Sequence, residues 1–343
     1  MKSLALRNSP HISLLKLVMA IAVVLAHVHC TYASAVTEIW PLKDPFDTSA
    51  VLNATILLHY ILMPLFFFIS GLTARNSFNK KTPERFWKDG ATRLAVPLVL
   101  GLLILEPWAA WGFSVQSGGN ILASFNLGHL WYLYFLILFY VLAPLVLKKV
   151  STSFLADPFK GPITFAAAFL IFLNVKKGII PTSQGAIPDL SAFLVYGLLF
   201  TYGWGFEGKK TSRDTTYVLL GLLSWVVTMI LFLNSDQNAS VVIQLAASAF
   251  AGVTVWFFVT GFFSLFTSIK NKKILALSRF HRLSYPIYLL HFPFVIWIPI
   301  LIAEPLQGFL LTKIFITFFA SLLFSVFLGK ALTPRSGLLS RLS

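Results

Sequence analysis

Lys16 and His27 lie within the first apolar stretch of the chain, residues 12–31. They are eleven positions apart, which on a helix is about three turns, so both lie on one face roughly 16 Å apart. A cation or an imidazole inside a membrane-spanning helix costs free energy and is therefore a candidate for function. The alternative is a snorkelling lysine and a histidine packed against another helix. Because imidazole suits proton transfer near neutral pH, His27 is the first candidate for a general base.

His291 is the second candidate, in the late segment SYPIYLLH, residues 284–291. It lies about 12 Å into its apolar stretch, near the middle of a membrane. A buried imidazole without a partner is costly there, so we expect His291 to face a partner or a cavity.

A basic segment follows the second apolar stretch, RNSFNKKTPERFWKDGATR, residues 75–93. It contains six basic and two acidic residues. Such a loop orients a membrane protein, and its arginines could also bind phosphate groups. The phosphate-binding candidates are Lys16, Arg75, Arg85, Lys88 and Arg93.

Small and aromatic residues mark two further places. Ser70 and Gly71 form a small pair that could line a pocket or allow close helix packing. His129, Trp131 and Tyr132 lie at one end of the fourth apolar stretch, where they could form an interfacial aromatic belt or a platform for substrate.

The composition identifies the elements that must position these residues. The chain is 57% hydrophobic and only 11% charged, whereas soluble domains carry about 25% charged residues. We expect an all-α polytopic helix bundle and a single integral-membrane domain, residues 1–343. Its ten predicted transmembrane stretches are 12–31, 54–74, 92–111, 128–147, 162–175, 190–206, 216–234, 240–268, 284–303 and 309–329.

The distribution of charge predicts the orientation. With the N-terminus in the cytoplasm, 23 of the 27 Lys and Arg residues fall on the cytoplasmic side, which places both termini there. The net charge of +15 therefore reflects topology, and nucleic acid is not an expected partner. Residues 1–35 resemble a cleavable signal peptide ending in Ala33-Ser34-Ala35, but the polar residues inside the run favour a retained helix. The only cysteine, Cys30, excludes an intramolecular disulfide.

Several kinds of site have no counterpart in the sequence. It contains no nucleotide-binding glycine motif, no HExxH and no CxxC, so no metal is expected. Acidic residues are few within or beside the apolar stretches, namely Glu106, Asp189 and Glu304. This scarcity disfavours a glycosidase, which needs a pair of carboxylates.

Five segments together resemble the membrane acyltransferase-3 family. Lys16 and His27 keep the spacing of its first-helix motif, with Lys in place of Arg. The family's FFxxSG motif resembles Phe67–Gly71, and its RxxRLxxP motif resembles Arg93 to Pro97. Its tryptophan-led motif resembles Trp131 to Pro144, and its SYxIYLLH motif resembles Ser284–His291. Gly90 stands where the family has the first Arg, and Leu136 where many members have Glu. The form HLW at residues 129–131 and the form MPLFFFISG at residues 63–71 most resemble the branch that includes the osmoregulated-glucan succinyltransferases.

The resemblance implies transfer of an acyl group, acetyl or succinyl, from cytoplasmic acyl-CoA. The acceptor would be a hydroxyl of a carbohydrate at the outer side of the inner (plasma) membrane. It implies His27 as the catalytic histidine, acting as the general base. Acyl transfer also needs an oxyanion stabiliser, for which His291, Tyr288 and Ser284 are the candidates. Acyl-CoA would be held by the five cations named above, in a pocket with Ser70, Gly71, Trp131, Ser284 and Tyr288. The alternative is a transporter or flippase of sugar or lipid-linked glycan that transfers no acyl group.

Overall fold

The computed structural model describes residues 9–32, 49–125, 127–147, 153–174, 190–206, 214–234 and 240–332. Helices are the only regular elements in these ranges. The α-helices are α1 (Pro10–Tyr32), α2 (Ser49–Phe78), α3 (Pro83–Gly90), α4 (Val96–Leu100), α5 (Glu106–Ser117), α6 (Ile121–Ser124), α7 (Trp131–Val146), α8 (Lys160–Asn174), α9 (Leu190–Gly205), α10 (Asp214–Leu233), α11 (Val241–Ser268), α12 (Lys272–Ala276), α13 (Ser284–Ile302) and α14 (Leu310–Leu332). The 3-10 turns are η4 (Gly128–Leu130), η6 (Ser153–Ala156) and η7 (Leu277–Leu283), and the π turns are η2 (Ala91–Ala95) and η3 (Gly101–Leu105).

Each of the ten predicted apolar stretches contains a helix. In the described part of the chain, eight helical segments are long and apolar enough to cross a membrane. The other two, α8 and α9, are apolar but shorter, at 15 and 16 residues. The expected all-helical membrane bundle is therefore confirmed, with eight segments of spanning length. The possible cleavage site, residues 33–35, and 12 of the 27 Lys and Arg residues counted for orientation lie outside the described residues.

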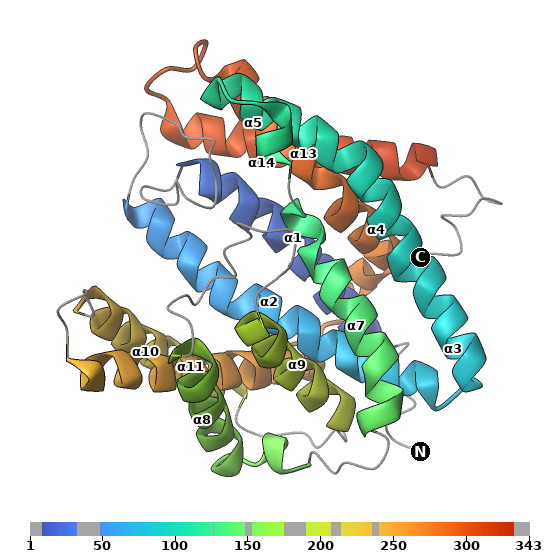
Figure 1. Ribbon diagram of the computed structural model, residues 1–343, viewed down its shortest axis with the longest axis vertical. Coiled ribbons are helices and arrows are strands. Elements are labelled where there is room, and N and C mark those ends of the chain that lie inside the picture. Colours follow the sequence, from blue (N-terminus) through green and yellow to red (C-terminus); the bar gives the residue numbers. More distant parts are fainter. Residues whose placement is uncertain are drawn as a thin grey trace.

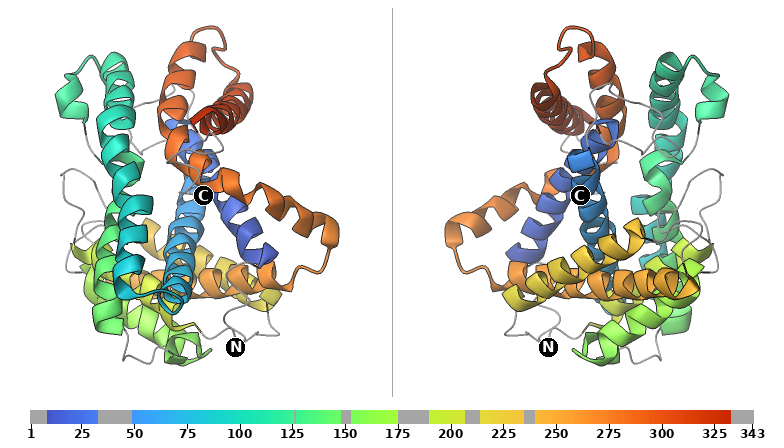
Figure 2. Two further views of the ribbon diagram at one scale, coloured as in Figure 1. Left: turned by 90° about the vertical axis from the view of Figure 1, so that its right-hand side faces the viewer. Right: turned by 90° about the vertical axis from the view of Figure 1, so that its left-hand side faces the viewer.

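Helices α1 and α2 run through the middle of the molecule and connect its two ends (Figures 1 and 2). Helix α1 packs against α2, α13 and α14, while α2 packs against α9 and α11. Figure 1 shows α5, α13 and α14 together at one end and α8, α10 and α11 at the other. The side chains on α1 and α13 can therefore meet although they are more than 250 positions apart in sequence.

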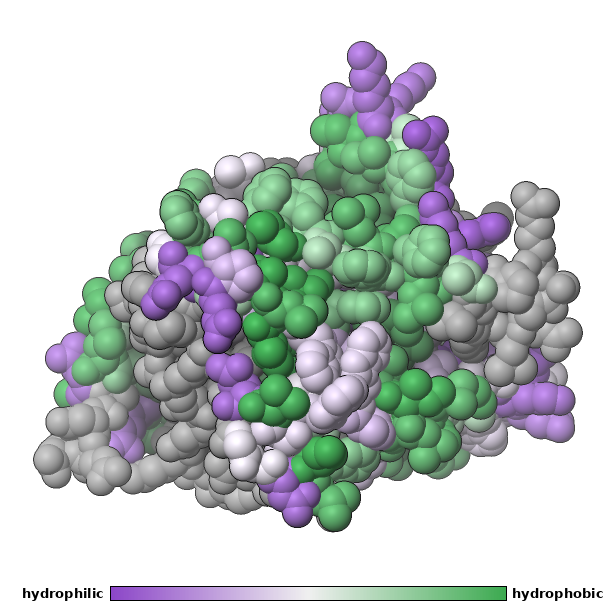
Figure 3. All heavy atoms as spheres, turned by 90° about the horizontal axis from the view of Figure 1, so that it is seen from above, coloured by the Kyte–Doolittle hydropathy of each residue, from purple (hydrophilic) through white to green (hydrophobic). Residues whose placement is uncertain are grey.

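Apolar side chains cover much of the outer surface. Figure 3, a view from above, shows broad hydrophobic areas with hydrophilic residues gathered at projecting points. The exposed residues include Leu103 on η3, Leu223 on α10, and Leu323 and Phe327 on α14, each more than 60% exposed. Such a surface suits contact with lipid tails, because an α-helix satisfies its backbone hydrogen bonds within the segment except near its ends.

Glycines allow α2 and α9 to pack closely. A Cβ on Gly71 would lie 1.9 Å from the carbonyl oxygen of Phe200, and one on Gly203 would lie 1.8 Å from that of Phe68. Small residues of this kind let membrane helices approach each other. Gly71 therefore belongs to a helix–helix contact, which was the packing interpretation of the Ser70-Gly71 pair.

Two π turns interrupt the long helical segment from Pro83 to Gln116. The N–H groups of Val96 and Glu106 bond five residues back, to the carbonyls of Ala91 and Gly101. Val96 and Glu106 are each followed directly by a proline, Pro97 and Pro107. Since proline offers no N–H and crowds the preceding turn, a local widening of the helix accommodates it. Such π turns occur frequently at functional sites.

Candidate active site

His27 on α1 and His291 on α13 contact each other directly. The Nε2 atom of His291 lies 3.0 Å from Nδ1 of His27, and the ring centroids are 5.0 Å apart. His291 is fully buried. The prediction that His291 faces a partner is thus met by the other candidate for acid–base chemistry.

Backbone carbonyls fix which nitrogens of this pair carry hydrogen. The Nδ1 atom of His291 lies 2.7 Å from the carbonyl of Tyr288 and 3.0 Å from that of Ile287. Carbonyls only accept, so this nitrogen is the N–H and Nε2 holds the lone pair. Nδ1 of His27, between Nε2 of His291 and the carbonyl of Val23 at 3.1 Å, is then also an N–H. The basic lone pair of a neutral His27 consequently lies on Nε2.

A second polar pair lies next to His291. The ring of His129 stacks on Phe292 at 4.6 Å and lies edge-on to His291 at 5.2 Å between centroids. Its Nδ1 atom is 3.3 Å from Oε1 of Glu106, and both side chains are almost completely buried. His129 is therefore buried inside the helix bundle and paired with Glu106. The sequence indicated both residues as polar groups near apolar stretches, but nothing in it showed that they would meet.

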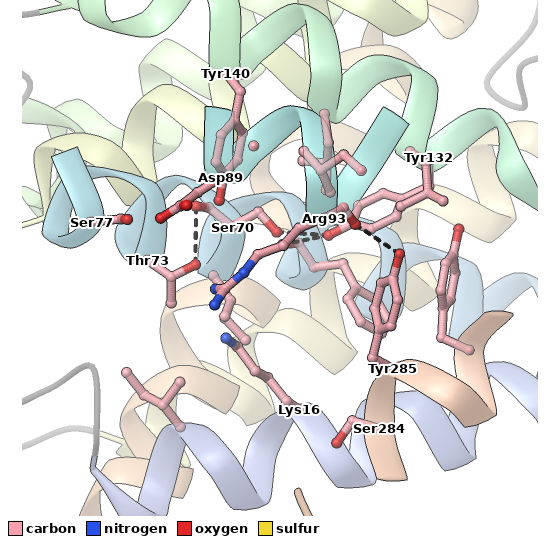
Figure 4. A pocket seen from close by; sticks show the side chains of 18 of the residues that line it. Lys16, Ser70, Thr73, Ser77, Asp89, Arg93, Tyr132, Tyr140, Ser284 and Tyr285 are labelled. Atoms are coloured by element: carbon pink, nitrogen blue, oxygen red, sulfur yellow. Dashed lines mark hydrogen bonds between the residues drawn. The ribbon is translucent and has the colours of Figure 1, made fainter. Parts of the chain in front are cut away.

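A cavity of about 470 Å³ lies between α1, α2, the η2 region, α7 and the start of α13, a size typical of ligand pockets. Figure 4 shows Lys16 and Arg93 directing their nitrogen atoms toward the same part of this cavity. Lys16 comes from α1 and Arg93 from the first π turn. The structure thus brings together two of the five predicted phosphate-binding residues.

The described lining of the cavity is strongly basic. Its permanent cations are Lys16, Lys81, Arg93 and Arg282, against one carboxylate, Asp89, which pairs with Lys81. Of these, Lys81 and Arg282, the latter in η7, were not among the predicted site residues. From the sequence alone, Arg282 counted only toward orientation, although it precedes the SYPIYLLH segment by two positions.

Hydroxyl groups line the inner part of the cavity. The Ser70 and Tyr132 hydroxyls are 2.7 Å apart (Figure 4). Ser284 also lines the cavity, and its buried Oγ has no hydrogen-bond partner in the described part of the chain. The Tyr285 hydroxyl donates to the carbonyl of Arg93 at 2.9 Å, an oxygen for which Pro97 offers no N–H. This bond ties the start of α13 to the π turn that carries Arg93.

The remaining predicted site residues lie elsewhere. Arg75 donates to the carbonyl of Trp204 at 3.0 Å. Arg85 and Lys88 are exposed on α3 and are not part of the described lining. Gly71 packs against α9, as described above, and Trp131 packs in an aromatic cluster with its ring 5.3 Å from that of Tyr196.

The cavity and the histidine pair are close neighbours along two helices. Tyr288 lines the cavity, and His291 follows it by three residues, about one helical turn or 5 Å. Ala20 lines it from α1, and His27 is seven residues further, about 10 Å. A ligand whose charged part lies near Lys16 and Arg93 could therefore extend its other end toward His27.

A comparison with protein families shows which family the chain belongs to. The family model described as an acyltransferase domain, that of the acyltransferase-3 family, matches residues 10–330. The chain belongs to this family. The match includes the histidine pair, the Glu106–His129 pair and the whole described lining of the cavity.

Curated relatives also match part of this chain, at low sequence identity. The chain is 22% identical over 212 residues to proteins named Glucans biosynthesis protein C, from Escherichia coli strains ED1a and SE11. The alignments cover 56% of this chain and 53% of each relative. The chain thus spans about half the length of the curated relatives it matches. No solved structure matches it significantly.

Proposed function

We propose that this protein is an O-acyltransferase that moves an acyl group from acyl-CoA to a hydroxyl of a carbohydrate acceptor. The observation that carries the proposal is a basic cavity that ends about one helical turn from a hydrogen-bonded histidine pair. Family membership supports the reaction class. The relatives' name, Glucans biosynthesis protein C, supports a carbohydrate acceptor.

The cavity suits the donor. Coenzyme A carries a pyrophosphate and a 3′-phosphate, and Arg and Lys bind phosphate oxygens through charge-assisted hydrogen bonds. Lys16, Arg93 and Arg282 would hold these phosphates, with Lys81 beside them. The narrow pantetheine arm would then pass Ser70 and Tyr288 and present its thioester to His27.

The histidine pair supplies the proton transfer. Nε2 of neutral His27 would take the proton of the acceptor hydroxyl as its oxygen bonds to the thioester carbonyl carbon. His291 would accept the Nδ1–H of His27 through its Nε2 lone pair and so stabilise the imidazolium. As the carbon–sulfur bond breaks, the proton passes from His27 to the departing thiolate, which leaves as CoA–SH. General-base catalysis of this kind typically contributes about 10²–10⁴-fold.

The proposed arrangement in the membrane follows from charge. With both termini and the basic cavity facing the cytoplasm, the donor is taken from the side where acyl-CoA is made. The acceptor would approach His27 from the outer side of the inner (plasma) membrane. In this proposal residues 1–343 form one integral-membrane domain, its ten apolar helices all belong to the bundle, and the acyl group is acetyl or succinyl.

Purified protein in lipid nanodiscs provides the test. We expect it to release CoA–SH from acetyl-CoA or succinyl-CoA in the presence of a glucan acceptor, and to leave an ester on that glucan detectable by mass spectrometry. No release with either donor and a range of glycans, combined with glycan flux into proteoliposomes without any acyl-CoA, would establish the transporter alternative instead.

A further inference from the structure

His129 forms a hydrogen bond that a proline in another helix makes possible. Pro293 lies inside α13 and has no N–H to give to the carbonyl four residues before it, that of Leu289. The Nε2 atom of His129 lies 3.0 Å from this oxygen and therefore carries the hydrogen. The Tyr288 hydroxyl donates in return to the backbone carbonyl of His129 at 2.8 Å. His129 thus clamps the segment of α13 that immediately precedes His291.

Glu106 fixes the other side of the His129 ring. With Nε2 as a donor, Nδ1 of a neutral His129 holds a lone pair, and it faces Oε1 of Glu106 at 3.3 Å. Neither atom has another hydrogen-bond partner in the described part of the chain. A bare carboxylate facing a lone pair in a buried site would repel it, whereas one proton held between the two atoms makes the contact attractive. The described residues include no other buried acidic side chain.

The backbone leaves room for this carboxylate. Gly128 has a φ of +46°, and a Cβ on it would lie 2.3 Å from one oxygen of Glu106 and 2.4 Å from the other. Glycine is required there for both conformation and space. Glu106 itself directly follows the second π turn, η3. Its carboxyl group therefore links two irregular segments of the backbone, this π turn and the turn at Gly128.

We propose that Glu106 and His129 are positioning residues for the catalytic pair. Glu106 fixes the tautomer and orientation of His129, and His129 holds α13 so that His291 meets His27. This inference rests on the proposed function and extends it to a second pair with no direct contact to substrate. The polar groups that face the Glu106–His129 pair are Tyr288 and His291 on α13, with His27 on α1 behind them.

Two substitutions of Glu106 distinguish the effect of losing its hydrogen bond from the effect of changing the size of the side chain. Gln can donate an amide N–H to Nδ1 of His129, whereas Leu has similar size and cannot. We expect Glu106→Leu to lower kcat about 10- to 100-fold, by analogy with the loss of a carboxylate that orients a metal-bound histidine, with an unchanged KM for acyl-CoA. Glu106→Gln should retain most of kcat. Equal losses in the two variants, or a loss that appears in KM instead, would overturn the inference.

A glycine pair provides a control in which Glu106 itself is intact. Gly128→Ala should displace the carboxyl group and reduce kcat as Glu106→Leu does. Gly118→Ala introduces a methyl group at the same kind of backbone conformation, φ +66°, but with nothing within 4 Å, so kcat should stay unchanged. Equal activities of the two alanine variants would contradict the role of the carboxyl group, even if Glu106→Leu fails to accumulate.

A spectroscopic measurement tests the clamp without any assay of transfer. In protein labelled with ¹⁵N-histidine, the His129 signal, assigned by its absence in His129→Gln, should show a protonated Nε2. Glu106→Leu should move its Nδ1 signal. An unprotonated Nε2 in the wild type would overturn the inference. A chain that transfers no acyl group but shows the expected signal would refute the proposed function and leave the clamp intact.

Discussion

Lys16 and Arg93 approach the same cavity from two different helical segments, and in the proposed function this convergence favours binding of an anion. Lys16 lies on α1 and Arg93 in the first π turn, and both line the cavity with Arg282. Their positions concentrate positive charge about three helical turns, roughly 16 Å, from His27 along α1. In the proposed function this distance is spanned by the pantetheine arm of the donor.

Arg93→Ala tests the donor site. We expect a rise in the KM for acyl-CoA of about 10- to 100-fold, because a hydrogen bond to a charged group contributes about 1.5–3 kcal/mol, with a smaller effect on kcat. The control is Arg85→Ala, since Arg85 is exposed and lies outside the described lining. Initial rates over a range of acyl-CoA concentrations measure both. Unchanged KM in Arg93→Ala, with normal accumulation in the membrane, would remove the phosphate site from this cavity.

The sequence predicts part of this site and not the rest, for a physical reason. The spacing of Lys16 and His27 determines that they share a helix face, and the cost of a buried imidazole predicts that His291 has a partner. Charge alone does not distinguish Arg93, which lines the cavity, from Arg85 or Lys88, which are exposed on α3. That difference depends on the π turn at Arg93 and on the packing of α7 against it.

Prolines and glycines set the geometry of the elements around the site. Pro97 and Pro293 leave the carbonyls of Arg93 and Leu289 to side chains of other segments, Tyr285 and His129. These cross-connections, which periodicity does not show, explain why the sequence did not predict the Glu106–His129 pair. Hydropathy located all ten apolar helices, and its two shortest predicted stretches, 162–175 and 190–206, are the ones in which α8 and α9 are shorter than the eight segments of spanning length.

Gly71→Ala tests the close contact between α2 and α9. The new methyl group would lie 1.9 Å from a backbone oxygen of α9, so the helices must separate. We expect a loss of about 1–3 kcal/mol, the usual cost of overpacking, measured as a lower Tm and reduced accumulation in the membrane. Gly197→Ala on α9 is the control, because its methyl group would meet only the edge of the Phe139 ring at 3.3 Å. An unchanged Tm for Gly71→Ala would show that the contact is looser than described.

At the scale of the whole molecule, α1 connects the proposed donor cavity to the proposed catalytic histidine pair. Lys16 lies where the helix lines the basic cavity, and His27 lies further along the same face, against His291 on α13. A donor entering from one side of the membrane and an acceptor from the other could meet at His27 without either crossing the bundle. Helices α10 and α11 pack at the far end and contribute none of the residues placed in the site.

Acyl transfer by His27→Ala, measured against His29→Ala, tests this account most directly. The two histidines lie on the same helix, about 200° apart around its axis, so a general effect on packing would affect both. We expect His27→Ala to accumulate normally and to lose transfer about 10²–10⁴-fold, while His29→Ala retains most of it. Equal losses in the two variants, or a His27→Ala protein that fails only because it does not accumulate in the membrane, would contradict the assignment of His27 as the general base.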